Sequence, residues 1–262
     1  MNDFLLEEIN TLKDTELQFA YILAAQYYSV LENRVEAEIL FKKASEFDNT
    51  LGFDFLFGQG ASTYTSTIAA EQYKPSVEWV NDNNYDNSEN KQTILVSMDE
   101  MFLRNYGPQL FFNIIALKKY HLHVHLVSRD RNSSIKLIVE SLNLFESLIK
   151  YADKTSRIIK PTFTFELVAD EVPSIKTYSA CARYIHADYF LERFENNILI
   201  LDADMFLIDD LKNYMTVLKD YEIGIAFSKG LVTILPWRRV MAGNVYLNNS
   251  EVVCQQYSRQ FL

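Results

Sequence analysis

The sequence has few of the residues that interrupt regular structure, cross-link small domains or bind polyanions. Its 7 glycines and 5 prolines among 262 residues exclude a flexible or fibrous chain and predict long regular elements. The two cysteines, Cys181 and Cys254, are too few for a disulfide framework, so a reducing, cytoplasmic location is expected. Lys+Arg number 25 against 35 Asp+Glu, and this net charge of -10 argues against nucleic acid as a main partner.

Long apolar runs are also missing. No stretch reaches the roughly 18 apolar residues that a membrane-spanning helix needs, so no transmembrane segment is expected. The first ten residues are acidic rather than basic and contain no cleavage motif, so they do not predict a signal peptide. What the chain does have is a hydrophobic content of 48%, enough for one large domain or two modest ones.

The first fifty residues predict a helical hairpin. Between Glu16 and Asp48 there is no proline or glycine, and apolar residues recur every three or four positions. Small and aromatic residues share one face in each half: Tyr21, Ala24, Ala25, Tyr28, Ala37, Phe41 and Ala44. This spacing resembles one tetratricopeptide repeat unit, although Asn49 stands at the usual proline position. A single unit cannot bury its own faces, so we expect residues 1–50 to pack on the next domain; docking of a protein partner is the alternative.

The following segment, 51–90, predicts a connection between domains. Its last ten residues contain five asparagines, whose side chains favour turns. Beyond it, apolar strand patterns alternate with helical patterns, and this alternation predicts an α/β domain over 91–262 with a largely parallel sheet. The predicted strands are 93–96, 121–127, 158–167, 198–201, 222–227 and 240–247, and the predicted helices are 110–119, 133–150 and 177–194.

Two carboxylates, Asp202 and Asp204, directly follow the apolar run 198–201. Open α/β sheets bind ligands at the carboxyl ends of their strands. Two like charges this close are unfavourable alone, but Mg²⁺ or Mn²⁺ prefers carboxylate oxygens and can bridge them to a diphosphate. The spacing therefore predicts a metal site, with a solvated turn that caps the next helix as the plain alternative.

The segment 198–211 resembles the signature of GT-A glycosyltransferases, specifically the retaining glycosyltransferase family 8. Four other stretches agree with that family in order: 94–102, 122–128, 178–187 and 241–248. The resemblance covers about 91–262 and implies a GT-A, Rossmann-like fold. It also implies transfer of a hexose, with retention, from a nucleotide-diphosphate sugar to a glycan or other hydroxyl acceptor, with Mn²⁺ or Mg²⁺ as the cofactor.

The same resemblance implies roles on the metal side of the site. Asp202 and Asp204 would bind the metal, Ala203 would lie beside the nucleotide, and Gly243 would face the sugar. Met241 departs from the family, which has asparagine there. The family's later elements, including a histidine that completes the metal site, lie beyond the last residue, so a C-terminally truncated enzyme with unknown catalytic residues is expected.

On the nucleotide side, Asp99 and Phe102 would contact the nucleotide, and Arg183 would reach the donor diphosphate. Each residue has a plain alternative. Asp99 could cap the helix that follows it, Phe102 could belong to the core, and Arg183 could form a surface salt bridge. Arg193, ten residues further on, competes with Arg183 for the phosphate role.

Three histidines, His121, His123 and His125, alternate along a predicted strand. Alternate residues share a face at a spacing of about 7 Å, so these rings would need further ligands to close a metal site, and a polar sheet face is expected instead.

Two other functions stay open. A haloacid dehalogenase-type phosphatase also has an Asp-x-Asp motif after a strand, with the first aspartate as nucleophile; Phe206 departs from that pattern. The second is a catalytically incomplete sugar-nucleotide-binding protein joined to a helical docking module.

Overall fold

The computed structural model describes residues 14–31, 33–47, 76–81, 92–117, 120–151, 159–170, 172, 175–205, 207, 211–227, 240–250 and 253. The chain divides into two compact units. One comprises Met1–Ala69 and Phe227–Met241, and the other comprises Ala70–Ala226 and Ala242–Leu262. Most of the predicted connection 51–90 and the last nine residues lie outside the described part, so the domain boundaries and the truncation remain predictions.

The predicted N-terminal hairpin is present as two helices, α2 (Asp14–Val30) and α3 (Arg34–Ser45). Asn33 caps α3, since its side-chain oxygen accepts a hydrogen bond from the backbone N–H of Glu36 at 3.4 Å. At the other end, the buried amide of Gln18 donates to the carbonyl of Ala44 at 3.0 Å. The two helices share a small core of their own, which consists of Tyr21, Ile22, Ala24, Ala25, Ala37, Leu40, Phe41 and Ala44. Its likeness to a tetratricopeptide unit remains a prediction.

The second unit contains almost all of a mixed, mostly parallel sheet of seven strands in the order β1-β4-β3-β2-β5-β7-β6. The bounds are β1 Val77–Trp79, β2 Thr93–Asp99, β3 His121–Ser128, β4 Thr162–Leu167, β5 Ile198–Leu201, β6 Ile223–Phe227 and β7 Val240–Leu247. The four central strands β4, β3, β2 and β5 are parallel to one another, whereas β1 pairs with β4 and β7 pairs with β5 in antiparallel fashion. The predicted fold class, α/β with a Rossmann-like sheet flanked by helices, is therefore confirmed.

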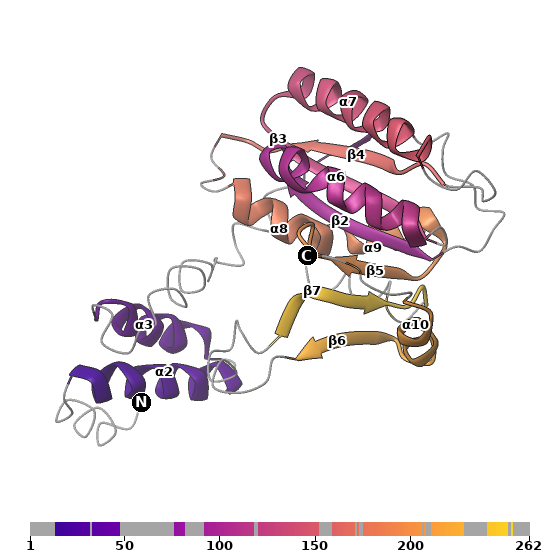
Figure 1. Cartoon of the computed structure of the whole chain (residues 1–262). Coiled ribbons are helices and arrows are strands. Elements are labelled where there is room, and N and C mark those ends of the chain that lie inside the picture. The colour runs from indigo at the N-terminus through magenta and orange to yellow at the C-terminus, as the bar shows by residue number, and fades with distance from the viewer. Residues whose placement is uncertain are drawn as a thin grey trace. The chain divides into compact units, whose positions relative to one another are not determined.

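Helices cover both faces of this sheet (Figure 1). They are α6 Glu100–Leu117, α7 Arg131–Ile149, α8 Ile175–Ile185, α9 Ala187–Phe194 and α10 Lys212–Leu218. The face beneath α6 and α7 is lined by alternate strand residues: Ile94, Val96, Met98, Leu122, Val124, Leu126, Phe163 and Phe165. On the opposite face α9 packs against Leu95, Ile198 and Ile200. Among the described helices, none has the length and apolarity required to cross a membrane.

Two predicted helices have different bounds in the structure. The helix predicted at 110–119 starts at Glu100, with Pro108 inside it, because Asp99 caps it and its buried residues begin at Leu103. The helix predicted at 177–194 is divided at His186 into α8 and α9. The division turns the aromatic face of α9 onto the sheet independently of α8.

The strand order reverses between β2 and β5. From β2 the chain proceeds outward to β3 and β4, and β5 then returns to the other side of β2. In such sheets the crevice for ligands lies outside the carboxyl ends of the strands at this point of reversal. Asp99 ends β2 and Asp202 follows β5, and the parallel register pairs Leu95 with Ile200. Both aspartates therefore lie at the carboxyl ends of neighbouring parallel strands, on the same side of the sheet's end.

Candidate functional site

Asp202 lies against the backbone of Gly243 in the neighbouring strand. Its N–H donates to the Gly243 carbonyl at 3.2 Å, and the pairing of Leu201 with Asn244 fixes the register of the two strands. A Cβ atom placed on Gly243 would lie only 1.9 Å from Oδ2 of Asp202. The carboxylate thus occupies the space that any other residue at 243 would fill, which is a physical reason for glycine here. The sugar-facing role predicted for Gly243 remains a prediction.

We expect Gly243→Ala to lower the free energy of unfolding by about 2 kcal/mol, as overpacking of an ordered region does. The new methyl group would force the Asp202 carboxylate out of its place. Gly107→Ala on α6 is the control, because its new Cβ would meet only the end of the Leu103 side chain, at 3.0 Å, and not an atom at 1.9 Å. Denaturant titration of both variants measures the difference, and equal losses would contradict the close fit at Gly243.

Arg183 on α8 holds Asp202 from the other side. Its guanidinium donates through Nη1 to the carbonyl of Leu201 at 2.7 Å and through Nη2 to Oδ1 of Asp202. The arginine side chain is only 4% exposed, whereas the Asp202 side chain is 45% exposed. Arg183 is therefore a buried anchor for the aspartate rather than a surface salt-bridge residue, and any contact with a diphosphate would be made from that position.

The competing arginine is located elsewhere. Arg193 lies on α9, and its guanidinium carbon is 5.0 Å from the centre of the Trp79 ring. Trp79 belongs to β1, at the far edge of the sheet from β5. The structure therefore brings Arg183, and not Arg193, to the end of β5.

The two aspartates of the motif offer accessible carboxylates, while the residue between them faces inward. Ala203 is buried and packs into the core beneath α6 and α7, and Asp204 is exposed. Asp202 keeps almost half of its side chain accessible although it is paired with Arg183. Carboxylate oxygens that solvent can reach are the donors that Mg²⁺ and Mn²⁺ prefer, so this donor set fits such a cation. The position of Ala203 leaves its predicted place beside the nucleotide untested.

Asp99 and Phe102 lie at the start of α6. Oδ1 of Asp99 accepts a hydrogen bond from the Phe102 N–H at 2.8 Å, as a helix N-cap does. The Phe102 ring is half-buried, 5.2 Å from the Tyr106 ring, and the Lys176 ammonium on α8 lies 5.8 Å from its centre. Asp99 therefore caps α6, as the plain alternative predicted. The Phe102 ring is partly exposed and lies beside the Lys176 ammonium. Sequence patterns gave no signal for Lys176.

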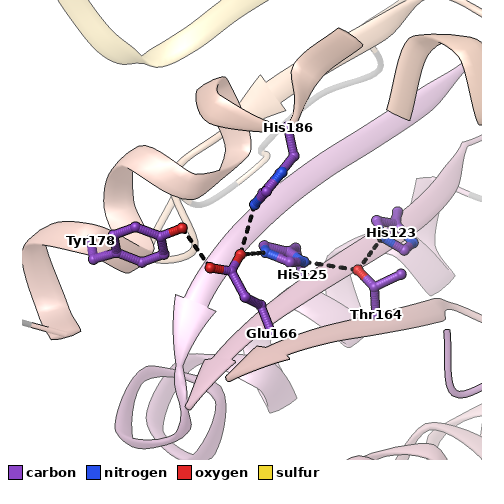
Figure 2. Close-up of polar contacts among 6 residues, drawn as sticks. All are labelled: His123, His125, Thr164, Glu166, Tyr178 and His186. Carbon is purple, nitrogen blue, oxygen red and sulfur yellow. Dashed lines mark hydrogen bonds and ion pairs between the residues drawn. The ribbon is translucent and has the colours of Figure 1, made fainter. Parts of the chain in front are cut away.

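The three histidines of β3 are buried in a row of hydrogen bonds with the alternate residues of β4. We call the set His121, His123, His125, Thr162, Thr164 and Glu166 the histidine ladder. His121 Nε2 contacts the Thr162 hydroxyl at 2.9 Å, and that hydroxyl contacts Nδ1 of His123 at 2.8 Å. The pattern repeats at Thr164, whose hydroxyl lies 2.9 Å from Nε2 of His123 and 2.9 Å from Nδ1 of His125. Figure 2 draws both contacts. The expected polar sheet face is therefore present but buried beneath α9.

Glu166 ends the ladder and collects further partners from outside the sheet. His125 Nε2 lies 3.2 Å and His186 Nε2 lies 2.7 Å from its Oε2 atom, and the Tyr178 hydroxyl donates to Oε1 at 2.5 Å (Figure 2). Burial acts to raise the pKa of Glu166, but the hydrogen bonds from His125, His186 and Tyr178 outweigh it and lower the pKa to about 2. The carboxylate is therefore ionised at neutral pH.

Burial has the opposite consequence for the histidines. It lowers the pKa of His121 to about 3. It also lowers the pKa of His123 well below the ordinary value, and the neighbouring histidines add to this effect. The pKa of His125 is lowered by burial and partly restored by Glu166. These three rings are therefore neutral at pH 7.

Three donor atoms, from His125, Glu166 and His186, lie within 4.8 Å of one another. Such a set could in principle hold a transition metal, but each contact is already a hydrogen bond of ordinary length. The sequence showed that the histidine row would need other ligands. The residues that join it come from β4 and the α8–α9 junction, and no local pattern indicated them.

The comparisons with known proteins add little to this geometry. The sequence matches no protein-family model, and no curated protein matches it. Among solved structures, the chain is similar to the crystal structure of mouse xyloside xylosyltransferase 1 in its apo form, with 13% sequence identity and a TM-score of 0.39. The match covers 66% of this chain and 71% of that one. A likeness at this level carries no argument about the function of this chain.

Proposed function

We propose that the chain is a glycosyltransferase that takes its sugar from a nucleotide-diphosphate donor and passes it to a hydroxyl acceptor. The observation that supports it most is the placement of Asp202. It emerges at the carboxyl end of β5 where the strand order reverses, accessible to solvent and fixed by Gly243 and Arg183. The resemblance to the retaining family 8 supports a hexose donor and retention of configuration.

In this proposal Asp202 and Asp204 hold a divalent cation, Mn²⁺ or Mg²⁺. When bound, such an ion neutralises the charge that develops on a nucleoside diphosphate leaving group. Arg183 keeps the Asp202 carboxylate at the carboxyl end of β5, and the exposed part of the Phe102 ring offers a surface on which a base can stack. Asp99 stabilises the start of α6 and thereby fixes the position of Phe102.

We expect nucleoside diphosphates to bind at least tenfold more tightly with Mn²⁺ than without it, because the cation screens the diphosphate from Asp202 and Asp204. Isothermal titration of the full chain with UDP and with GDP, in Mn²⁺ and in EDTA, measures the ratio. A binding constant that does not change on adding the metal would contradict the proposal.

A second measurement separates the proposal from its alternatives. Release of UDP or GDP from the corresponding hexose donors in the presence of Mn²⁺ would support a transferase. Metal-dependent binding of the nucleotide with no release from any donor would favour a sugar-nucleotide-binding protein. Phosphatase turnover that Asp202→Asn abolishes would favour the haloacid dehalogenase-type reaction instead.

A further inference from the structure

The histidine ladder has a direction, and Glu166 sets it. An ionised carboxylate only accepts hydrogen bonds, so His125 must donate from Nε2 and its Nδ1 must accept from Thr164. The Thr164 oxygen then accepts from Nε2 of His123. The same alternation continues through Thr162 to His121, whose Nδ1 contacts the Thr93 hydroxyl at 3.3 Å. All three rings of β3 therefore carry their proton on Nε2.

The same carboxylate fastens α8 at two points. Tyr178 lies in the first half of α8 and donates to Oε1, and His186 immediately follows α8 and donates to Oε2. Between these two residues on the helix lies Arg183, which holds the Leu201 carbonyl and the Asp202 carboxylate. Displacing the helix by the length of one hydrogen bond would withdraw the guanidinium from the aspartate.

We infer that Glu166 is a positioning residue for the site: by anchoring Tyr178 and His186 it fixes α8, and so holds Arg183 against Asp202. Glu166 itself is fully buried and belongs to β4, two strands away from β2 and three from β5. It acts through the helix and not on a ligand. Its effect on metal affinity rests on the proposed function, whereas its effect on α8 and on the Asp202 backbone does not.

The test uses Glu166→Gln in the full chain. A glutamine has the same shape but carries no charge and presents an NH₂ group on one side, so at least one of the three donors must give up its hydrogen bond or, in the case of Tyr178, accept instead of donate. We expect backbone amides of residues 175–186 and of Asp202 to exchange at least tenfold faster, with β2 unchanged. We expect the dissociation constant for Mn²⁺ alone, measured by electron paramagnetic resonance, to rise about tenfold.

The four histidines of the sequence all lie in this cluster, so histidine ¹⁵N spectra report on it without overlap from other rings. The wild type is expected to show His121, His123 and His125 protonated on Nε2, and Glu166→Gln to change the state of His125 or His186. A wild-type His125 protonated on Nδ1, or stoichiometric Zn²⁺ binding through His125 and His186, would overturn the inference.

Thr162→Val is the matched control. It breaks the ladder between His121 and His123 but leaves the contacts of Glu166 with α8 in place. We expect it to leave the exchange of 175–186 and the Mn²⁺ affinity unchanged. Tyr178→Phe, which removes a single hydrogen bond, keeps the test decisive if Glu166→Gln fails to fold.

The outcomes separate the two proposals. If wild type binds Mn²⁺ and Glu166→Gln loosens α8 without weakening that binding, the positioning role is wrong and the proposed function stands. If wild type binds no Mn²⁺, the proposed function fails, and exchange at Asp202 alone decides the positioning role. Unchanged exchange in both Glu166→Gln and Tyr178→Phe would also overturn it.

Discussion

If the chain is the transferase that we propose, Asp202→Asn is expected to reduce sugar transfer about a thousandfold, because it would remove a charged ligand of the proposed cation, whose stabilisation of the leaving diphosphate is worth several kcal/mol. Asparagine is the informative substitution. Its side-chain oxygen can still accept the hydrogen bond from Arg183, so the buried guanidinium keeps a partner and the fold is retained. Release of UDP or GDP from hexose donors with saturating Mn²⁺ measures the loss.

Glu192→Gln provides the matched control for this experiment. It replaces one exposed carboxylate by an amide on α9, away from the end of β5, and we expect transfer to stay within twofold of wild type. Near-wild-type transfer by Asp202→Asn, with unfolding curves that match the wild type, would show that the reaction does not use this carboxylate.

Acidification from pH 6.5 to 5 is expected to lower the free energy of unfolding by about 3 kcal/mol. The folded protein keeps His121, with a pKa of about 3, and His123, with a pKa well below 6.5, as neutral rings. Below pH 6.5 the unfolded chain binds a proton at each ring, so each one costs about 1.4 kcal/mol of stability per pH unit. Glu166 adds to the loss below pH 4.5, since its folded pKa of about 2 lies under its ordinary value.

Urea titrations at several pH values measure this slope, with the fluorescence of Trp79 as the probe. Its ring lies 5.0 Å from the His123 ring, and Trp237→Phe leaves it as the only tryptophan in the sequence. In the same background His121→Gln should reduce the slope by about 1.4 kcal/mol per pH unit, because one proton uptake is removed. A stability that stays constant between pH 6.5 and 5 would contradict the neutral ladder.

Local patterns accounted for most of the secondary structure. The strand 198–201 was predicted with the bounds that it has, because an apolar run before two aspartates is a local signal. Where a pattern was short or interrupted by proline, the prediction from it was wrong or missing. Pro108 suggested that the helix began near it, whereas the capping hydrogen bond at Asp99 starts it ten residues earlier than predicted. The strand 77–79 was missed, since three residues carry too little periodicity.

The candidate site was likewise only partly predictable from the sequence. The sequence indicated Asp202, Asp204 and Arg183 individually, from the strand that precedes the aspartates and from a family resemblance. It did not indicate that Arg183 is buried and paired with Asp202, because that pairing depends on how α8 packs against the end of β5. The sequence offered Arg193 as an equal candidate for the phosphate role, but in the structure Arg193 lies beside Trp79 of β1.

The sequence alone determined the class of this protein: a helical hairpin and an α/β domain in which two carboxylates follow a buried strand. Those features depend on residues close together in the chain, whose periodicity reports which side is buried. Only the tertiary structure decided that Gly243 makes room for Asp202 and that Glu166 joins His125 to His186. One of the few glycines, Gly243, is therefore explained by the fold and not by a local pattern. The pairing of β5 with β7 brings Asp202 against position 243, 41 residues further along the chain, and leaves no room there for a side chain.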